Sequence, residues 1–243
     1  MTRRGQARAE SPGTFSDQVA SEHRRIDADA WADIYVVGDV HGCRRTFERL
    51  LDRLDVGPDD LVVCVGDVVR KGPDSKGALA LVRERENVLT VRGNNEQGLL
   101  DGSKSDPALD AEDLSYIETL PLAISWEDVL VVHGGIDHRE PLSEHAPEDV
   151  LNTRSLTGGG YERPYWFERR SERPQVFFGH TVLAEAFETP YAVGLDTGCV
   201  YGGELTAYDW RAGEFVTVEP PETYRSRSDD SIVSPRPAEP VTE

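Results

Sequence analysis

The first half of the chain alternates short apolar runs with segments in which apolar residues recur every three or four positions. The runs at 34–37, 61–65 and 88–91 are rich in Val, Ile and Leu, which predicts buried strands. The segments at 44–54 and 75–85 between them have helical periodicity. The order strand, helix, strand, helix, strand predicts parallel pairing in a sheet with helices packed on it.

The second half has a different pattern after a helical stretch at about 111–119. Strands are predicted at 122–125, 129–132, 176–178, 191–195, 204–210 and 214–218, joined mostly by short turns. The segment 136–174 is long, irregular and rich in Gly, Arg and Pro. A long irregular insertion inside a compact domain is usually functional or mobile.

The two ends of the chain lack periodicity and are rich in polar residues. We therefore expect a disordered tail at 1–30, one domain at 31–219 and a second disordered tail at 220–243. No stretch approaches the roughly 18 apolar residues of a membrane span. The pair Arg3-Arg4 is not followed by an apolar segment, so we expect no export signal.

The charge balance limits the classes of partner. The chain carries 45 acidic and 26 basic residues, a net charge of −19, which argues against duplex nucleic acid as a partner because clustered Lys and Arg supply most of that affinity. Such a surface is typical of proteins that work in concentrated salt, and equally of ordinary acidic proteins. The three cysteines, Cys43, Cys64 and Cys199, cannot all pair, which indicates reduced thiols and a cytoplasmic setting.

Side chains of metal-ligand type follow five of the predicted strands, usually next to glycine. In an open α/β sheet ligands bind at the carboxyl ends of strands, so these loops are expected to converge on one crevice. Each motif alone is more often a turn or a helix cap than a metal site. Chance is, however, a poor explanation for five such motifs that all follow predicted strands. The candidate ligands are Asp39, His41, Asp67, Asn94, His133 and His180.

Six oxygen and imidazole ligands are too many for one catalytic ion that keeps an open position, so two divalent ions are predicted. The donor types suit Mn²⁺, our first choice, and also Fe or Zn²⁺. Asp67 is the natural bridging carboxylate, at an ion separation of about 3.5–4 Å. A water or hydroxide held between the ions would be the nucleophile.

These motifs, in this order over residues 33–210, resemble the calcineurin-like metallophosphoesterases, in the branch of phosphoprotein phosphatases and symmetrical diadenosine tetraphosphate hydrolases. The resemblance implies a four-layer α/β sandwich, with two central mixed sheets flanked by helices. It also implies that Asp39, His41 and Asp67 hold one metal, while Asp67, Asn94, His133 and His180 hold the other. The segment 195–207 is similar to the late motif of the nucleotide hydrolases.

Two positions depart from the family pattern. Residues 66–72 read Gly-Asp-Val-Val-Arg-Lys-Gly where the family has Gly-Asp-x-Val-Asp-Arg-Gly, and Asn95 follows Gly-Asn where the family has histidine. In the family that histidine is the proposed general acid and that aspartate orients it. We expect Asn95 and Arg70 to occupy the catalytic positions of this histidine and aspartate, beside Asp67. The residues expected to bind the substrate's phosphate are Lys71, Arg154 and Asn94.

Loss of a general acid, worth typically about 10²–10⁴-fold, matters most for poor leaving groups. We therefore predict a phosphoesterase that acts on small phosphorylated metabolites or dinucleoside polyphosphates ahead of phosphoproteins. One alternative is a serine/threonine phosphatase in which water or His138 supplies the proton. Another is a weakly active module that binds metal and nucleotide.

Overall fold

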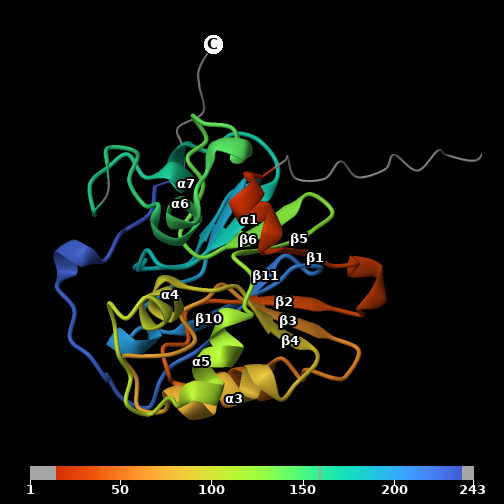
Figure 1. The fold of residues 1–243 in the computed structure, drawn as a ribbon, viewed down its shortest axis with the longest axis vertical. Helices are drawn as coiled ribbons and strands as arrows, with labels where there is room; N and C mark the ends of the chain where they lie inside the picture. Colours follow the sequence, from red (N-terminus) through yellow and green to blue (C-terminus); the bar gives the residue numbers. More distant parts are fainter. Residues whose placement is uncertain (1–14, 159, 237–243) are drawn as a thin grey trace, which may run out of the picture.

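Two β-sheets face one another in the computed structural model, which describes residues 15–158 and 160–236 (Figure 1). The five-stranded sheet has the order β11-β10-β2-β3-β4. Strands β2, β3 and β4 are parallel, as predicted, and β10 runs antiparallel to β2 and β11. The bounds are β2 (Ile34–Val37), β3 (Leu61–Cys64), β4 (Val88–Thr90), β10 (Leu205–Asp209) and β11 (Glu214–Val218).

The second sheet has six strands in the order β1-β5-β6-β7-β9-β8. Strand β6 is antiparallel to β5 and parallel to β7, and β7 is parallel to β9. The carboxyl ends of β6 and β7 therefore lie at one edge of this sheet. The bounds are β1 (His23–Arg25), β5 (Ala123–Trp126), β6 (Val129–Val132), β7 (Gln175–Phe178), β8 (Phe187–Glu188) and β9 (Ala192–Gly194).

Alternation along the strands builds the layers, because successive side chains point to opposite faces of a sheet. Ile34 and Val36 of β2 pack against β6 and β7 between the sheets, while Tyr35 and Val37 pack against helices on the outside. On the other sheet, Leu130 of β6 faces outward to a second helical layer. The predicted four-layer sandwich of two mixed sheets is confirmed.

Helices cover both outer faces, with α6 and α7 over the six-stranded sheet and α3 over the other (Figure 1). Helix α2 packs beside α3 on the five-stranded sheet, and α5 packs against α3 and α4. No helix in 15–158 or 160–236 is long and apolar enough to cross a bilayer. The insertion 136–174 is partly helical. The bounds are α2 (Arg44–Arg53), α3 (Ser75–Arg83), α4 (Asn94–Leu100), α5 (Ala111–Glu118), η2 (Leu142–Glu144), α6 (Pro147–Asn152), α7 (Trp166–Arg169) and η3 (Cys199–Tyr201).

The expected N-terminal tail is shorter than the 1–30 we predicted. Residues 17–30 contain α1 (Asp17–Ser21), β1 and η1 (Ala28–Ala30), and β1 pairs in parallel with β5. Two of the three residues of this edge strand are exposed, so no apolar pattern signals it in the sequence. The rest of that predicted tail, residues 1–14, lies outside the described residues.

The expected C-terminal tail, 220–243, also differs from the structure. Residues 220–236 lie along the domain, with η4 (Asp229–Ser231) and a bridge between Leu183 and the buried Val233. The backbone carbonyl of Val200 accepts hydrogen bonds from the amides of Tyr224 and Arg225, at 3.2 and 3.0 Å. Backbone bonds rather than an apolar stripe hold this segment, which explains why composition alone indicated disorder. Residues 237–243 lie outside the described residues.

Candidate metal centre

Three buried side chains from the ends of β2 and β3 form a compact ligand group. One donor atom from each of Asp39, His41 and Asp67 lies within 4.8 Å of the others. His41 Nε2 is 3.7 Å from an oxygen of each carboxylate. Burial lowers the pKa of His41 to about 3, so its imidazole is neutral and Nε2 offers a lone pair. The set fits a divalent cation.

His133, at the end of β6, adds a second imidazole to Asp67. Its Nδ1 is 2.8 Å from the carbonyl oxygen of Val65, so Nδ1 carries the proton and donates it. Its buried Nε2 has no hydrogen-bond partner among residues 15–158 and 160–236 and lies 3.4 Å from Asp67 Oδ1. Asp67 thus faces His41 through Oδ2 and His133 through Oδ1. A carboxylate with one imidazole on each oxygen has the arrangement that a bridging ligand requires.

His180 lies beside this group, but its ring nitrogens have other partners. Its ring centroid is 5.0 Å from that of His133, and its amide donates to Asp39 at 3.2 Å. Arg154 donates to Nδ1 at 3.2 Å, and Nε2 is 3.2 Å from the carbonyl oxygen of Asn152. The structure thus brings His180 to the site with Nδ1 covered by the guanidinium.

Asn94 and Asn95 begin α4, an element that the sequence analysis treated as a loop. Asn94 is half-buried, and its Oδ1 lies 3.4 Å from Asn95 Nδ2. Asn95 is buried and donates to both oxygens of Asp67, from its backbone amide at 2.8 Å and from Nδ2. Asn95 therefore holds the bridging candidate in place.

The other end of the Asn95 amide faces two cations. Its Oδ1 accepts hydrogen bonds from Arg70 and from Lys104 Nζ, the latter at 3.3 Å. Lys104 also donates to the carbonyl oxygen of Asn94 at 2.8 Å. Asn95 and Arg70 are thus paired, as the histidine and aspartate are in the family pattern. Here, however, residue 70 is the hydrogen-bond donor and residue 95 is the acceptor. The two departures form one unit, and Lys104, to which the sequence analysis gave no role, is its third member.

Glu96 is a second residue without a predicted role. It is fully buried, and its carboxylate accepts from the backbone amides of Asp67, Val69 and Gly93, at 2.9, 3.0 and 2.8 Å. It therefore ties the loop after β3 to the start of α4. An acidic residue three positions after a helix cap is a capping signal that could have been read from the sequence.

Lys71, a predicted phosphate ligand, points at a predicted metal ligand. Its Nζ lies 2.7 Å from His41 Nε2, where it covers the lone pair as a bound cation would. Burial opposes its charge, but Asp67 and Tyr201 raise the pKa of Lys71 above its ordinary value. Lys71 at His41 and Arg154 at His180 each place a cation against an imidazole nitrogen of a candidate metal ligand.

The backbone of these loops is strained. Five of the seven non-glycine residues with positive φ among those described belong to the site. Such conformations cost of order 1–3 kcal/mol each and cluster at functional sites. The five are His41, Asp67, Arg70, Lys71 and His180, with φ between 48° and 72°.

His138, the alternative proton donor, lies apart from this group. It is half-buried, and its enclosed Nδ1 has no hydrogen-bond partner in the part of the chain that the structure describes. Among the described residues it makes no hydrogen bond to a candidate ligand.

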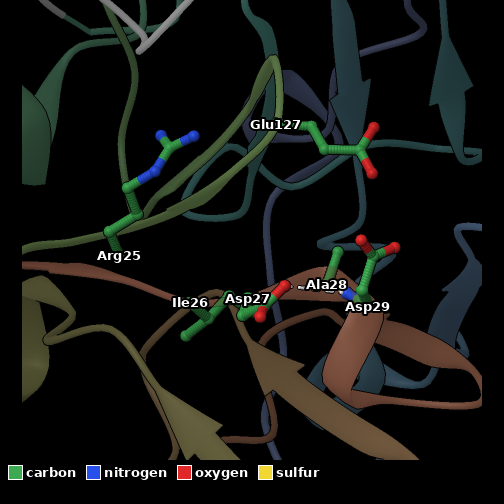
Figure 2. Close-up of a pocket in the computed structure, with 6 residues that line it drawn as sticks. All are labelled: Arg25, Ile26, Asp27, Ala28, Asp29 and Glu127. Atoms are coloured by element: carbon green, nitrogen blue, oxygen red, sulfur yellow. Dashed lines mark hydrogen bonds between the residues drawn. The ribbon is translucent and has the colours of Figure 1, made fainter. Parts of the chain in front are cut away.

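Two pockets adjoin the site. One of about 490 Å³ is bordered by Asn94, Lys104 and Asn152, and one of about 340 Å³ by Asn152 and Arg154. A third pocket, of about 450 Å³, lies at the opposite ends of the strands, where β1 and β5 finish (Figure 2). It is bordered by Arg25, Ile26, Asp27, Ala28, Asp29 and Glu127, and none of these residues belongs to the metal group.

Comparison with known proteins gives consistent relatives. A serine/threonine-protein phosphatase 1 of Salmonella typhimurium is 30% identical over 209 residues, covering 76% of this chain and 94% of the relative. A symmetrical bis(5'-nucleosyl)-tetraphosphatase of Chromohalobacter salexigens is 26% identical over 271 residues, covering 79% and 99%. A solved structure with the provisional name diadenosine tetraphosphatase matches at a TM-score of 0.71 and 29% identity, covering 81% and 97%.

The family model described as calcineurin-like phosphoesterase matches residues 32–214, a range that includes every candidate metal ligand. The chain therefore belongs to the calcineurin-like phosphoesterases, a family of metal-dependent hydrolases of phosphate esters and anhydrides.

Proposed function

We propose that this phosphoesterase prefers phosphoanhydrides, with dinucleoside polyphosphates as the substrate class, over phosphoserine and phosphothreonine. One observation carries the proposal: the position of the family's proton donor holds Asn95, whose amide oxygen is occupied by Arg70 and Lys104. An amide held in this way donates hydrogen bonds but transfers no proton. The names of tetraphosphatase relatives support the same class.

The candidate ligands form two sets that share Asp67. Asp39 and His41 would share one divalent ion with it, and Asn94, His133 and His180 the other; the orphaned Nε2 of His133 supports this assignment. When bound, the two ions would act as Lewis acids on the phosphoryl group and on the attacking water. We propose Mn²⁺ as the native metal, since oxygen and imidazole donors suit it, and the cytoplasm as the compartment.

The chain's own residues then act on the substrate. Lys71 and Arg154 would move from the imidazoles to the substrate's phosphate oxygens once cations occupy the ligand set. Water attacks phosphorus and releases a proton to the solvent, the bond from phosphorus to the leaving oxygen breaks, and that oxygen keeps the electron pair. A phosphate leaving group, with a pKa of about 6, departs without protonation. Lys104 and Arg70, which both contact Asn95, would stabilise the negative charge of this leaving group.

A comparison of leaving groups tests this proposal. With Mn²⁺ present, kcat/KM for bis(5'-adenosyl) tetraphosphate should exceed that for a phosphoserine peptide by at least about 10², the lower value of a missing general acid. Lys104→Gln should reduce the rate on the tetraphosphate, whereas Lys76→Gln, at an exposed ion pair with Asp110, should not. Equal efficiency on both substrates would refute the proposal.

Protein phosphatase activity is the second candidate. It is favoured by the 30% identity to the Salmonella typhimurium serine/threonine-protein phosphatase 1. A phosphoserine peptide that is turned over as fast as the tetraphosphate would support it.

A further inference from the structure

The C-terminal segment after residue 214, which lies beyond the family match, brings two arginines to the metal centre. Arg225 Nε donates to the carbonyl oxygen of Lys71 at 3.0 Å, which ties the segment to the loop after β3. Arg227 follows two residues later, and its Nε donates to the carbonyl oxygen of Ser231 at 3.0 Å. Both contacts are made by a stretch that the sequence pattern assigned to a disordered tail.

Arg227 lies between two tyrosines that also contact the site's cations. Its guanidinium carbon is 4.7 Å from the ring centroid of Tyr201 and 5.3 Å from that of Tyr161, and it donates to the Tyr161 hydroxyl. Lys71 Nζ lies 5.4 Å from the Tyr201 ring, and Arg154 lies 5.0 Å from the Tyr161 ring. The result is a continuous arc from His41 to His180, formed by Lys71, Tyr201, Arg227, Tyr161 and Arg154.

The three cations of this arc have no carboxylate partner within 4 Å among residues 15–158 and 160–236, whereas other arginines and lysines of the chain do. The nearby acid, Asp196, is buried and accepts from the amide of Gly198 at 3.1 Å. In a chain of net charge −19, three adjacent cations that contact no carboxylate among the described residues are available to bind an anion, although Asp67 and Asp196 act on Lys71 electrostatically. Guanidinium groups bind phosphate in a bidentate manner, and stacking on tyrosine fixes their planes.

We propose that Arg227 is a specificity-determining residue that binds a second phosphate of the substrate, next to the phosphate being hydrolysed. This inference rests on the proposed function and deepens it, because only a substrate with two or more linked phosphates reaches both the metal ligands and Arg227. The tyrosines hold Arg227 in place, and the C-terminal segment becomes a functional part of the site.

The test is a pair of arginine variants. Arg211 is the matched control, because it also lies over an aromatic ring, 5.3 Å from Trp210, and donates to backbone carbonyls remote from the site. Arg227→Gln should lower kcat/KM for bis(5'-adenosyl) tetraphosphate by at least about tenfold, the effect of one lost charge-assisted hydrogen bond. For p-nitrophenyl phosphate, which has a single phosphate, kcat/KM of this variant should stay within about twofold of the wild-type value. Arg211→Gln should change neither.

Calorimetric binding of inorganic tripolyphosphate gives a readout that does not require turnover. Arg227→Gln should weaken this binding by at least about tenfold, and Arg227→Lys should restore part of it because the charge returns without the bidentate geometry. An unchanged dissociation constant overturns the inference, as does an equal loss of rate on both substrates. A wild-type protein that hydrolyses no phosphate compound refutes the proposed function, while tripolyphosphate binding still decides the role of Arg227.

Discussion

Substitution of Gly179 tests how tightly the metal centre is packed. A Cβ at this position would lie 1.9 Å from Asp39 Oδ1 and 2.6 Å from a methyl carbon of Val65. Ordinary contact begins at 3.4 Å, so the carboxylate must retreat by 1.5 Å, the difference of these two distances. Asp39 is buried and accepts from the amide of His180, so this displacement would break that hydrogen bond and move the carboxylate from its place in the ligand group.

Gly179→Ala should therefore reduce kcat by about 10², the cost of a misplacement of about 1 Å, and raise the Mn²⁺ concentration needed for half-maximal activity. Overpacking should also lower the free energy of unfolding by about 1–3 kcal/mol. Metal-dependent kinetics and urea unfolding measure the two effects. Gly57→Ala is the control, since its Cβ meets its nearest neighbour at 3.4 Å. A Gly179→Ala protein with wild-type Mn²⁺ dependence and kcat would refute the reasoning.

Two further substitutions test the residues that the sequence analysis overlooked. Glu96→Ala leaves three buried backbone amides without an acceptor and should lower the free energy of unfolding in urea by about 3–5 kcal/mol. The control Glu48→Ala, at an exposed pair with Arg44, should lower it by less than about 1 kcal/mol. Similar losses of stability in both variants would contradict the role of Glu96. Gly98→Ala places a Cβ 2.5 Å from Lys104 Cδ, so we expect a helix stabilised by up to about 1 kcal/mol but lower tetraphosphatase activity, and unchanged activity would show that the position of Lys104 is unimportant.

The parallel strands and the convergence of the loops could be predicted because both follow from strong local patterns, whereas the four-layer sandwich was predicted from the resemblance to a family. The apolar runs at β2, β3 and β4 define parallel strands, and parallel strands bring their carboxyl ends together. Asp39, His41, Asp67 and His133 were predicted on this basis, and the structure brings them together.

Other parts of the site depend on contacts that no local pattern encodes. Asn95 and Arg70 each appear in the sequence as an isolated departure, and only the structure shows that they contact each other. Lys104 returns to the start of α4 because its amide bonds to the carbonyl of Gly98 after the helix ends. Arg227 lies in a segment held mainly by backbone hydrogen bonds, and the amino-acid composition of a segment does not reveal such bonds. In each case the decisive partner is distant in sequence or has no apolar signature.

The central claim is that two divalent ions share Asp67, and anomalous diffraction from crystals grown with Mn²⁺ tests it most directly. We expect two anomalous peaks about 3.5–4 Å apart, one beside His41 and one beside His133, with an oxygen of Asp67 toward each. Crystals of Asp67→Asn should lose at least one peak. A single peak in the wild-type crystals, or a pair of peaks that does not contact Asp67, would contradict the account.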